Sequence, residues 1–154
     1  MGRRFDTISF LTDYGTEDEF VGVVKSIVRD IAPHVQVIDL THAIAPYDVR
    51  AGSLALARSI PYVPAGVVLA VVDPGVGSDR RAIAVEVGDG MSVLVGPDNG
   101  LLAPAVAMAG GAERAVELTN PEYRFPRRLR SPPPADRWRL PDRRQPSRHH
   151  SARR

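Results

Sequence analysis

The chain has 154 residues, 44% of them hydrophobic, so it is long enough to bury one core, and we expect a single domain. The sequence contains no cysteine, which excludes disulfides, thiolate nucleophiles and cysteine-ligated metals. There is no run of about 18 or more apolar residues, and polar residues follow soon after the start. We therefore expect neither a membrane span nor a secretory signal, and a cytoplasmic location.

The net charge of +2 is the sum of two regions of opposite charge. Residues 1–123 carry nine Lys and Arg against 16 Asp and Glu, whereas residues 124–154 carry 11 Arg against two Asp. The second region also holds six of the 14 prolines and has no Val, Ile or Met, so it cannot bury enough apolar surface to offset its chain entropy. We predict a folded domain over 1–123 and a disordered Arg/Pro-rich tail over 124–154.

The first half of the folded region alternates strand and helix patterns. A short apolar strand ends at Thr12 and is followed by a turn-forming cluster. Thr16 and Glu19 have the spacing of a capping box, and apolar residues recur at helical spacing from Phe20 until Pro33 ends the helix. Further along we predict a strand over 35–40 and a second helix over 49–60.

The second half begins with the continuously apolar run 66–72, which is typical of a strand covered on both faces. Residues 82–87 and 92–95 are predicted to form two strands joined by the Gly88-Asp89-Gly90 turn as a hairpin. A short helix over 101–108 and a last strand over 114–118 complete the pattern. The β-α-β-α-β opening predicts an α/β fold, an open and mainly parallel sheet flanked by helices.

Three polar clusters follow predicted strands, and in an open α/β sheet such positions converge on the ligand-binding edge. They comprise Thr12-Asp13-Tyr14-Gly15 with Asp18, Asp73-Pro74-Gly75-Val76-Gly77 with Arg80, and Gly96-Pro97-Asp98-Asn99-Gly100. Each also has a purely structural interpretation, because Asp, Asn, Pro and Gly are ordinary turn and helix-cap residues. The glycine-rich phosphate loops of dinucleotide and nucleoside triphosphate binders are missing. A nucleoside without phosphates is the better-fitting ligand.

Five ordered strings give the chain a family resemblance. They are Phe-Leu-Thr-Asp-Tyr-Gly (10–15), Ile-Asp-Leu-Thr-His (38–42), Val-Asp-Pro-Gly-Val-Gly (72–77) with Arg80-Arg81, Gly-Pro-Asp-Asn-Gly-Leu-Leu (96–102) and Asn-Pro-Glu-Tyr (120–123). In this order and spacing they resemble the S-adenosyl-L-methionine (SAM) hydroxide adenosyltransferases, which are related to SAM-dependent fluorinases and chlorinases. The resemblance covers about three quarters of the chain.

The resemblance implies an enzyme in which water attacks the 5′ carbon of SAM and gives adenosine and L-methionine, with no cofactor besides the SAM substrate. It implies that Asp13 grips the ribose hydroxyls, and that Asp18 and Tyr47 line the same pocket. It places Asp73 and Arg80 in the group that prepares the attacking water. It also makes Tyr14 and Asn99 substrate-binding candidates. No residues stand at metal-binding spacing in the folded part.

The nucleophile is predicted to be hydroxide rather than halide. Fluorinase-like relatives lack the aspartate and arginine arrangement and carry an inserted loop after the following strand. This chain has Asp73, Arg80 and only the short Gly88-Asp89-Gly90 turn. A SAM-dependent halogenase stays an alternative, and so does Arg80 as a solvated turn residue.

The end of the chain departs from the family. A Phe-His-Gly-Arg-Asp-like motif, whose histidine completes the water-activating group, and a second β-rich domain are both expected after Tyr123 and both missing. His149 and His150 are too far along to replace that histidine. We expect residues from about 125 onward to be a frameshifted or misannotated end, testable by resequencing the locus.

The family's active site forms between the first domain of one subunit and the second domain of its neighbour in a homotrimer, so this chain is predicted to hold half a pocket and to turn over weakly or not at all. Two other classes stay open. One is a catalytically silent adenosine- or SAM-binding module. The other is a basic-tailed nucleic-acid-binding protein, favoured only by the tail.

Overall fold

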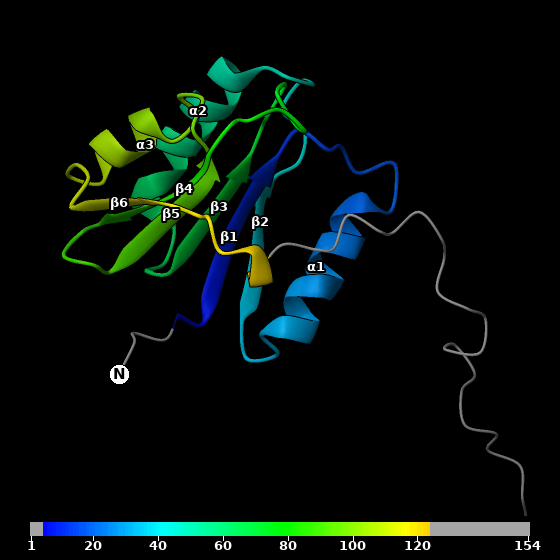
Figure 1. Ribbon diagram of the computed structural model, residues 1–154, viewed down its shortest axis with the longest axis horizontal. Helices are drawn as coiled ribbons and strands as arrows, with labels where there is room; N and C mark the ends of the chain where they lie inside the picture. Colours follow the sequence, from blue (N-terminus) through cyan, green and yellow to red (C-terminus); the bar gives the residue numbers. More distant parts are fainter. Residues whose placement is uncertain (1–4, 124–154) are drawn as a thin grey trace, which may run out of the picture. The chain divides into compact units, whose positions relative to one another are not determined.

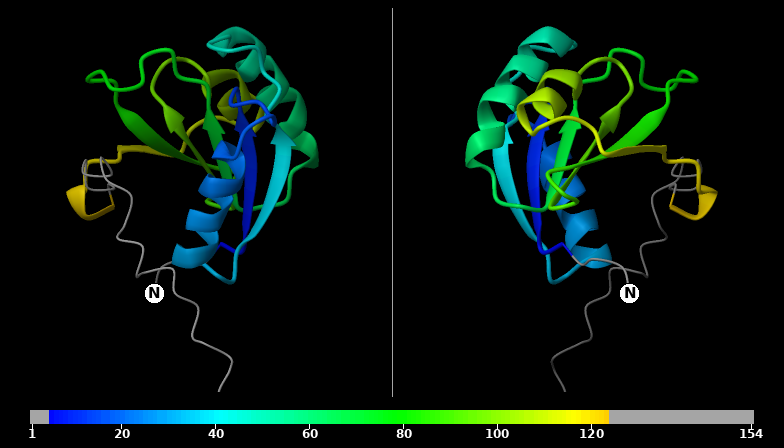
Figure 2. Two further views of the ribbon diagram at one scale, coloured as in Figure 1. Left: turned by 90° about the vertical axis from the view of Figure 1, so that its right-hand side faces the viewer. Right: turned by 90° about the vertical axis from the view of Figure 1, so that its left-hand side faces the viewer.

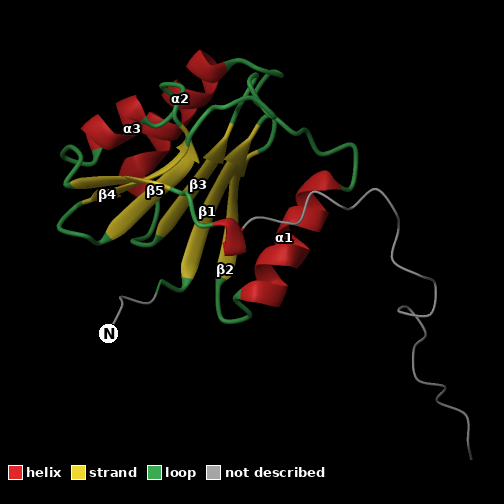
Figure 3. Ribbon diagram, in the orientation of Figure 1, coloured by secondary structure: helices red, strands yellow, loops and turns green. Residues whose placement is uncertain are grey.

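The computed structural model describes residues 5–123, and residues 5–119 belong to one compact unit. The strands are β1 (Thr7–Thr12), β2 (Gln36–Thr41), β3 (Val67–Val71), β4 (Ala82–Val87), β5 (Ser92–Pro97) and β6 (Arg114–Glu117). The helices are α1 (Phe20–Ile31), α2 (Val49–Ser59) and α3 (Ala103–Met108), with a 3-10 turn, η1 (Ile60–Tyr62), after α2. Strands and helices alternate along the chain as far as β3, after which β4 and β5 follow with no helix between them (Figure 1; Figure 3).

The six strands form one mixed sheet in the order β2-β1-β3-β5-β4-β6. The first four in this order are parallel, while β4 runs antiparallel to both β5 and β6. The predicted α/β fold with a mainly parallel sheet is therefore confirmed. The carboxyl ends of β1, β2, β3 and β5 all lie along one edge, as the register requires.

Helices cover the two faces of this sheet unequally. Helices α2 and α3 pack beside each other on one face, and α1 lies on the other (Figures 1 and 2). The core lies beneath α2 and α3, where Leu56 of α2 and the alternate strand residues Val68, Ala70 and Leu94 are fully buried. No residue of α1 is fully buried, so the second face is covered only in part.

The hairpin between β4 and β5 is confirmed, together with the turn that makes it. Asp89 and Gly90 both have positive φ, at 56° and 68°, and the Met91 N–H donates to the Gly88 carbonyl at 3.0 Å. Positive φ at both central positions is what a type I′ turn requires; Gly88 before them also has a positive φ, and the ladder of the two strands closes at Val87 and Ser92.

The predicted capping box at Thr16 and Glu19 is wrong. Helix α1 begins at Phe20, and Glu19 makes no side-chain cap. The carboxylate of Asp18 instead accepts a hydrogen bond from the Phe20 N–H at 3.0 Å. One acidic side chain therefore satisfies the first free donor of the helix without the reciprocal pair that the sequence pattern suggested.

The remaining described residues include a short 3-10 turn, η2 (Pro121–Tyr123), in the unit that begins at Asn120. The predicted tail over 124–154, with His149 and His150, lies outside the described residues, and so the domain boundary after residue 123 stays a prediction. Within residues 5–123, no helix is long and apolar enough to cross a bilayer.

Candidate active site

The two key carboxylates follow neighbouring parallel strands. Strand β1 pairs with β3 up to the partners Thr12 and Val71. Asp13 is the next residue after β1, and Asp73 comes two residues after the end of β3. Because both strands run in the same direction, the two side chains start from the same edge of the sheet. The sequence prediction that these clusters converge is met by the topology.

The phenol of Tyr14 lies close to both carboxylates. Burial raises the pKa of Tyr14, and the negative charges of Asp13 and Asp73 raise it further. The ring packs edge-on against Phe20, with centroids 4.8 Å apart. Tyr14 therefore lies within the electrostatic field of both acids, and its raised pKa favours the neutral phenol.

Asp13 joins the end of β1 to the connection between β2 and α2. Its Oδ2 accepts a hydrogen bond from the backbone N–H of Tyr47 at 2.8 Å. Tyr47 has φ of 67°, and the Asp48 N–H donates to the Ala45 carbonyl at 3.0 Å. The four residues 45–48 thus form a hydrogen-bonded turn with proline second and a left-handed residue third, a place that glycine usually takes.

Tyr47 is an aromatic residue in a conformation that L-residues avoid, and the residue is 68% exposed. Packing of the ring therefore does not explain the strain. Left-handed non-glycine residues concentrate at functional sites, where surrounding contacts hold them in place. The Asp13 contact supplies that restraint here, and it leaves the ring in the open beside the carboxylates' edge of the sheet.

Asp73 is held on two sides. Its Oδ1 lies 2.9 Å from the Arg80 Nε and also accepts the Gly75 N–H at 2.9 Å. The Asp73 side chain is 14% exposed and that of Arg80 is 30% exposed, so the ion pair is partly buried but still accessible to solvent. A carboxylate in this setting can accept a proton from a bound water, while the arginine fixes its orientation.

Two of the predicted substrate-binding side chains are engaged with backbone. Asn99 Nδ2 donates to the Val72 carbonyl at 2.9 Å, and its Oδ1 accepts the Leu101 N–H at 3.1 Å. Asn99 thus ties the end of β5 to the residue before Asp73. Asp18 is exposed and caps α1. For both, the geometry shows a structural role, and direct contact with substrate stays a prediction.

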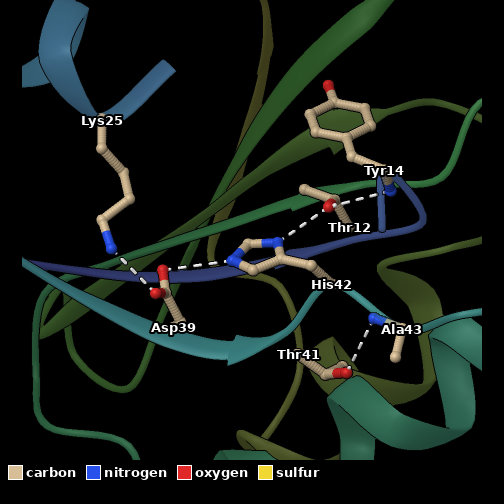
Figure 4. A network of polar contacts seen from close by, with 7 residues as sticks. All are labelled: Thr12, Tyr14, Lys25, Asp39, Thr41, His42 and Ala43. Carbon is tan, nitrogen blue, oxygen red and sulfur yellow. Dashed lines mark hydrogen bonds and ion pairs between the residues drawn. The ribbon is translucent and has the colours of Figure 1, made fainter. Parts of the chain in front are cut away.

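The sequence prediction missed a polar network behind this site, which Figure 4 shows. The buried ring of His42 has its Nδ1 2.8 Å from Thr12 Oγ1 and its Nε2 3.1 Å from Asp39 Oδ1, the latter off the line of a regular hydrogen bond. Asp39 also pairs with Lys25 of α1 at 2.8 Å. Thr12 Oγ1 accepts the Tyr14 N–H at 3.2 Å. In the sequence, only the spacing of Asp39 and His42, three residues apart at the end of a predicted strand, could have indicated this network.

A cavity of about 600 Å³ lies elsewhere, between β1, β2 and the α2–η1 segment. Apolar side chains such as Ile38 and Leu40 line it, and neither Asp13 nor Asp73 does. It is thus separate from the carboxylates, and its size does not make it the reactive site. Among residues 5–123, no three His, Asp or Glu side chains come together as a metal-binding group.

Known proteins with similar sequences point to one family. The sequence model of the SAM hydroxide adenosyltransferase N-terminal domain matches residues 8–137. The (R)-S-adenosyl-L-methionine hydrolase of Salinispora arenicola is 54% identical over 116 residues, which cover 75% of this chain and 44% of that protein. The fluorinase of an Actinoplanes species is 27% identical over 135 residues, covering 73% of this chain and 45% of that protein.

Solved structures agree. A conserved hypothetical protein from Thermus thermophilus has a TM-score of 0.66 and 44% identity, over 75% of this chain and 48% of that one. An uncharacterized conserved protein from Thermotoga maritima has a TM-score of 0.69 and 38% identity, over 75% and 44% of the two chains. The chain spans less than half the length of these relatives. On the matched region and the shared fold, it belongs to the SAM hydroxide adenosyltransferase N-terminal domain family.

Proposed function

We propose that this chain supplies the adenosine-facing half of a SAM hydrolase. The reaction is attack of water on the 5′ carbon of SAM. The bond from that carbon to the sulfonium sulfur breaks, methionine leaves with the electron pair, and the water loses one proton as it becomes the 5′ hydroxyl of adenosine. A sulfonium leaves without protonation, so the protein has to position the nucleophile and accept its proton.

The observation that carries the proposal is that Asp13 and Asp73 follow neighbouring parallel strands and start from the same edge of the sheet. Asp13, anchored by the Tyr47 N–H, is proposed to take the two ribose hydroxyls, because an ionised carboxylate accepts two donors at once. The exposed ring of Tyr47 is proposed to pack against the nucleoside. Asp73 is proposed to accept the proton of water, with Arg80 holding its orientation.

Hydroxide is preferred to halide as the nucleophile because hydrolases are the more similar relatives, at 54% against 27% identity for a fluorinase. The reaction as proposed needs no cofactor. We place the working assembly in the cytoplasm as a homotrimer, in which a neighbouring subunit's second domain completes the pocket. Where no second domain completes the pocket, turnover is expected to be weak.

The test follows adenosine release from SAM by chromatography, beside calorimetry with adenosine, on the full chain. Asp73→Asn should abolish turnover and leave adenosine affinity unchanged, because the amide keeps the shape but is a far poorer proton acceptor. Asp13→Asn should weaken adenosine binding. An Asp73→Asn variant with the wild-type rate contradicts the proposal.

The silent binding module is the second candidate, because Asp13, held by the Tyr47 N–H, is placed to accept ribose hydroxyls whether or not a water is activated. It predicts adenosine binding without any adenosine release from SAM. The nucleic-acid-binding alternative rests only on the Arg-rich segment outside the described residues. Deleting 124–154 should then remove DNA binding and spare adenosine binding.

A further inference from the structure

His42 contacts the turn that carries Asp13 and Tyr14 at two points. Its ring reaches Thr12, the last residue of β1, and its carbonyl accepts the Gly15 N–H at 2.8 Å. Asp13 and Tyr14 lie between these two contacts. A single residue from the β2 side therefore fixes both ends of the segment that bears the ribose-binding carboxylate.

The proton positions in this network follow from what each group is able to donate. The Asp39 carboxylate only accepts, so in the neutral His42 ring the proton sits on Nε2, which faces Asp39. Nδ1 is then an acceptor for the Thr12 hydroxyl. That leaves a lone pair of the Thr12 oxygen for the Tyr14 N–H. The two hydrogen bonds of the Thr12 hydroxyl are thus satisfied in one direction, while His42 Nε2 faces Asp39 without a regular hydrogen bond.

The ring has little freedom to leave this arrangement. Its side chain is only 5% exposed, and it packs edge-on against Phe10 with centroids 4.9 Å apart. Asp39, itself held by Lys25 of α1, stands at the far nitrogen. Thr12 is fully buried, so its hydroxyl does not reach a ligand. The network thus has no direct access to the reacting atoms, and it acts through the backbone of the turn.

We propose that His42 is a positioning residue of the adenosine site, setting the backbone of residues 13–15 so that Asp13 meets the ribose hydroxyls. This inference rests on the proposed function for its ligand. It goes beyond that function by assigning the affinity for adenosine in part to a side chain that does not touch it. Asp39 and Lys25 orient the ring and contribute to the same effect.

Two amide substitutions separate the roles of the two ring nitrogens. His42→Asn keeps an acceptor near the place of Nδ1 and so keeps the Thr12 contact, whereas His42→Gln keeps a donor near Nε2 and loses it. We expect His42→Gln to weaken adenosine binding by about tenfold, as for the loss of one oriented hydrogen bond, and His42→Asn to be closer to wild type. His34→Gln, the same change at an exposed histidine, should have no effect.

Amide hydrogen exchange gives a readout that does not depend on the ligand. In His42→Gln, the Tyr14 and Gly15 amides should exchange about tenfold faster, while amides in the central strands β3 and β5 keep their protection. Faster exchange throughout the sheet would show a merely structural role and overturn the proposal. Unchanged exchange at Tyr14 and Gly15 would also overturn it.

The outcomes keep the two proposals apart. If the wild-type chain binds no adenosine, the proposed function fails, and the exchange experiment still decides the role of His42. If His42→Gln does not fold, Asp39→Asn provides the second variant, because it loosens the ring without removing it. It should accelerate exchange at the same two amides by a smaller factor, and no change there would refute the proposal.

Discussion

The left-handed Tyr47 makes a prediction in which stability and binding move in opposite directions. A non-glycine residue in this conformation costs roughly 1–2 kcal/mol. Glycine relieves that strain. It also increases the conformational entropy of the unfolded chain, which lowers the free energy of unfolding by about 0.4–1 kcal/mol. Tyr47 as a residue is 68% exposed, and little packing is lost with its ring. Tyr47→Gly should therefore raise the free energy of unfolding by about 0.5–1 kcal/mol, and the melting temperature by about 2–5 °C.

Adenosine affinity should fall in the same variant by about tenfold or more, because stacking of one base on an aromatic ring contributes about 1–3 kcal/mol. Thermal unfolding and calorimetry measure the two effects. Tyr62→Gly is the matched control, as Tyr62 is 87% exposed and has no positive φ. That control should be destabilised. A Tyr47→Gly variant that loses as much stability as Tyr62→Gly would refute the strain argument, and unchanged adenosine affinity would refute the role of the ring.

Three further predictions concern single side chains. Since the pKa of Tyr14 is raised, the folded chain keeps a proton that the unfolded chain releases, so the free energy of unfolding should fall as pH rises above about 10. Asp13→Asn should lower the pH at the midpoint of the Tyr14 titration. An unchanged midpoint would show that the Asp13 charge does not act on Tyr14. A Cβ at Gly75 would lie 2.6 Å from Arg80 Nε and would displace the guanidinium. Gly75→Ala and Arg80→Ala should therefore reduce SAM hydrolysis to the same level, and the double variant should be no slower than either. Additive losses in the double variant would contradict the shared contact. Gly22→Ala, in open space within α1, should stabilise the fold by about 0.5–1 kcal/mol in denaturant titration, and a destabilised variant would count against the helix.

The strands and their convergence were accessible from the sequence because they depend on local patterns. The apolar run at β3 and the turn at Gly88-Asp89-Gly90 each fix a local conformation, and parallel strands then bring their ends to one edge. Asp13 and Asp73 were placed correctly for that reason. Their chemical roles come from the family resemblance and not from the pattern.

The parts that were missed depend on contacts between distant residues. The start of α1 is set by Asp18 and by the packing of Tyr14 on Phe20, which the Thr16 and Glu19 spacing does not encode. The left-handed Tyr47 was equally hidden, because its turn has no glycine and is held by a carboxylate 34 positions earlier. Side-chain partners across that distance are not visible in local sequence.

The reversed direction of β4 has a consequence for how this protein can vary. Since Ala82 at the start of β4 pairs with Pro97 at the end of β5, the connection that leaves β3 returns to the sheet at the edge it left. It never crosses a face of the sheet, and no helix has to be displaced when it grows. Each doubling of such a loop costs only about 0.6 kcal/mol of closure entropy. Insertions between Asp73 and Ala82 can therefore change what lies beyond this edge of the sheet while the strands and helices stay the same.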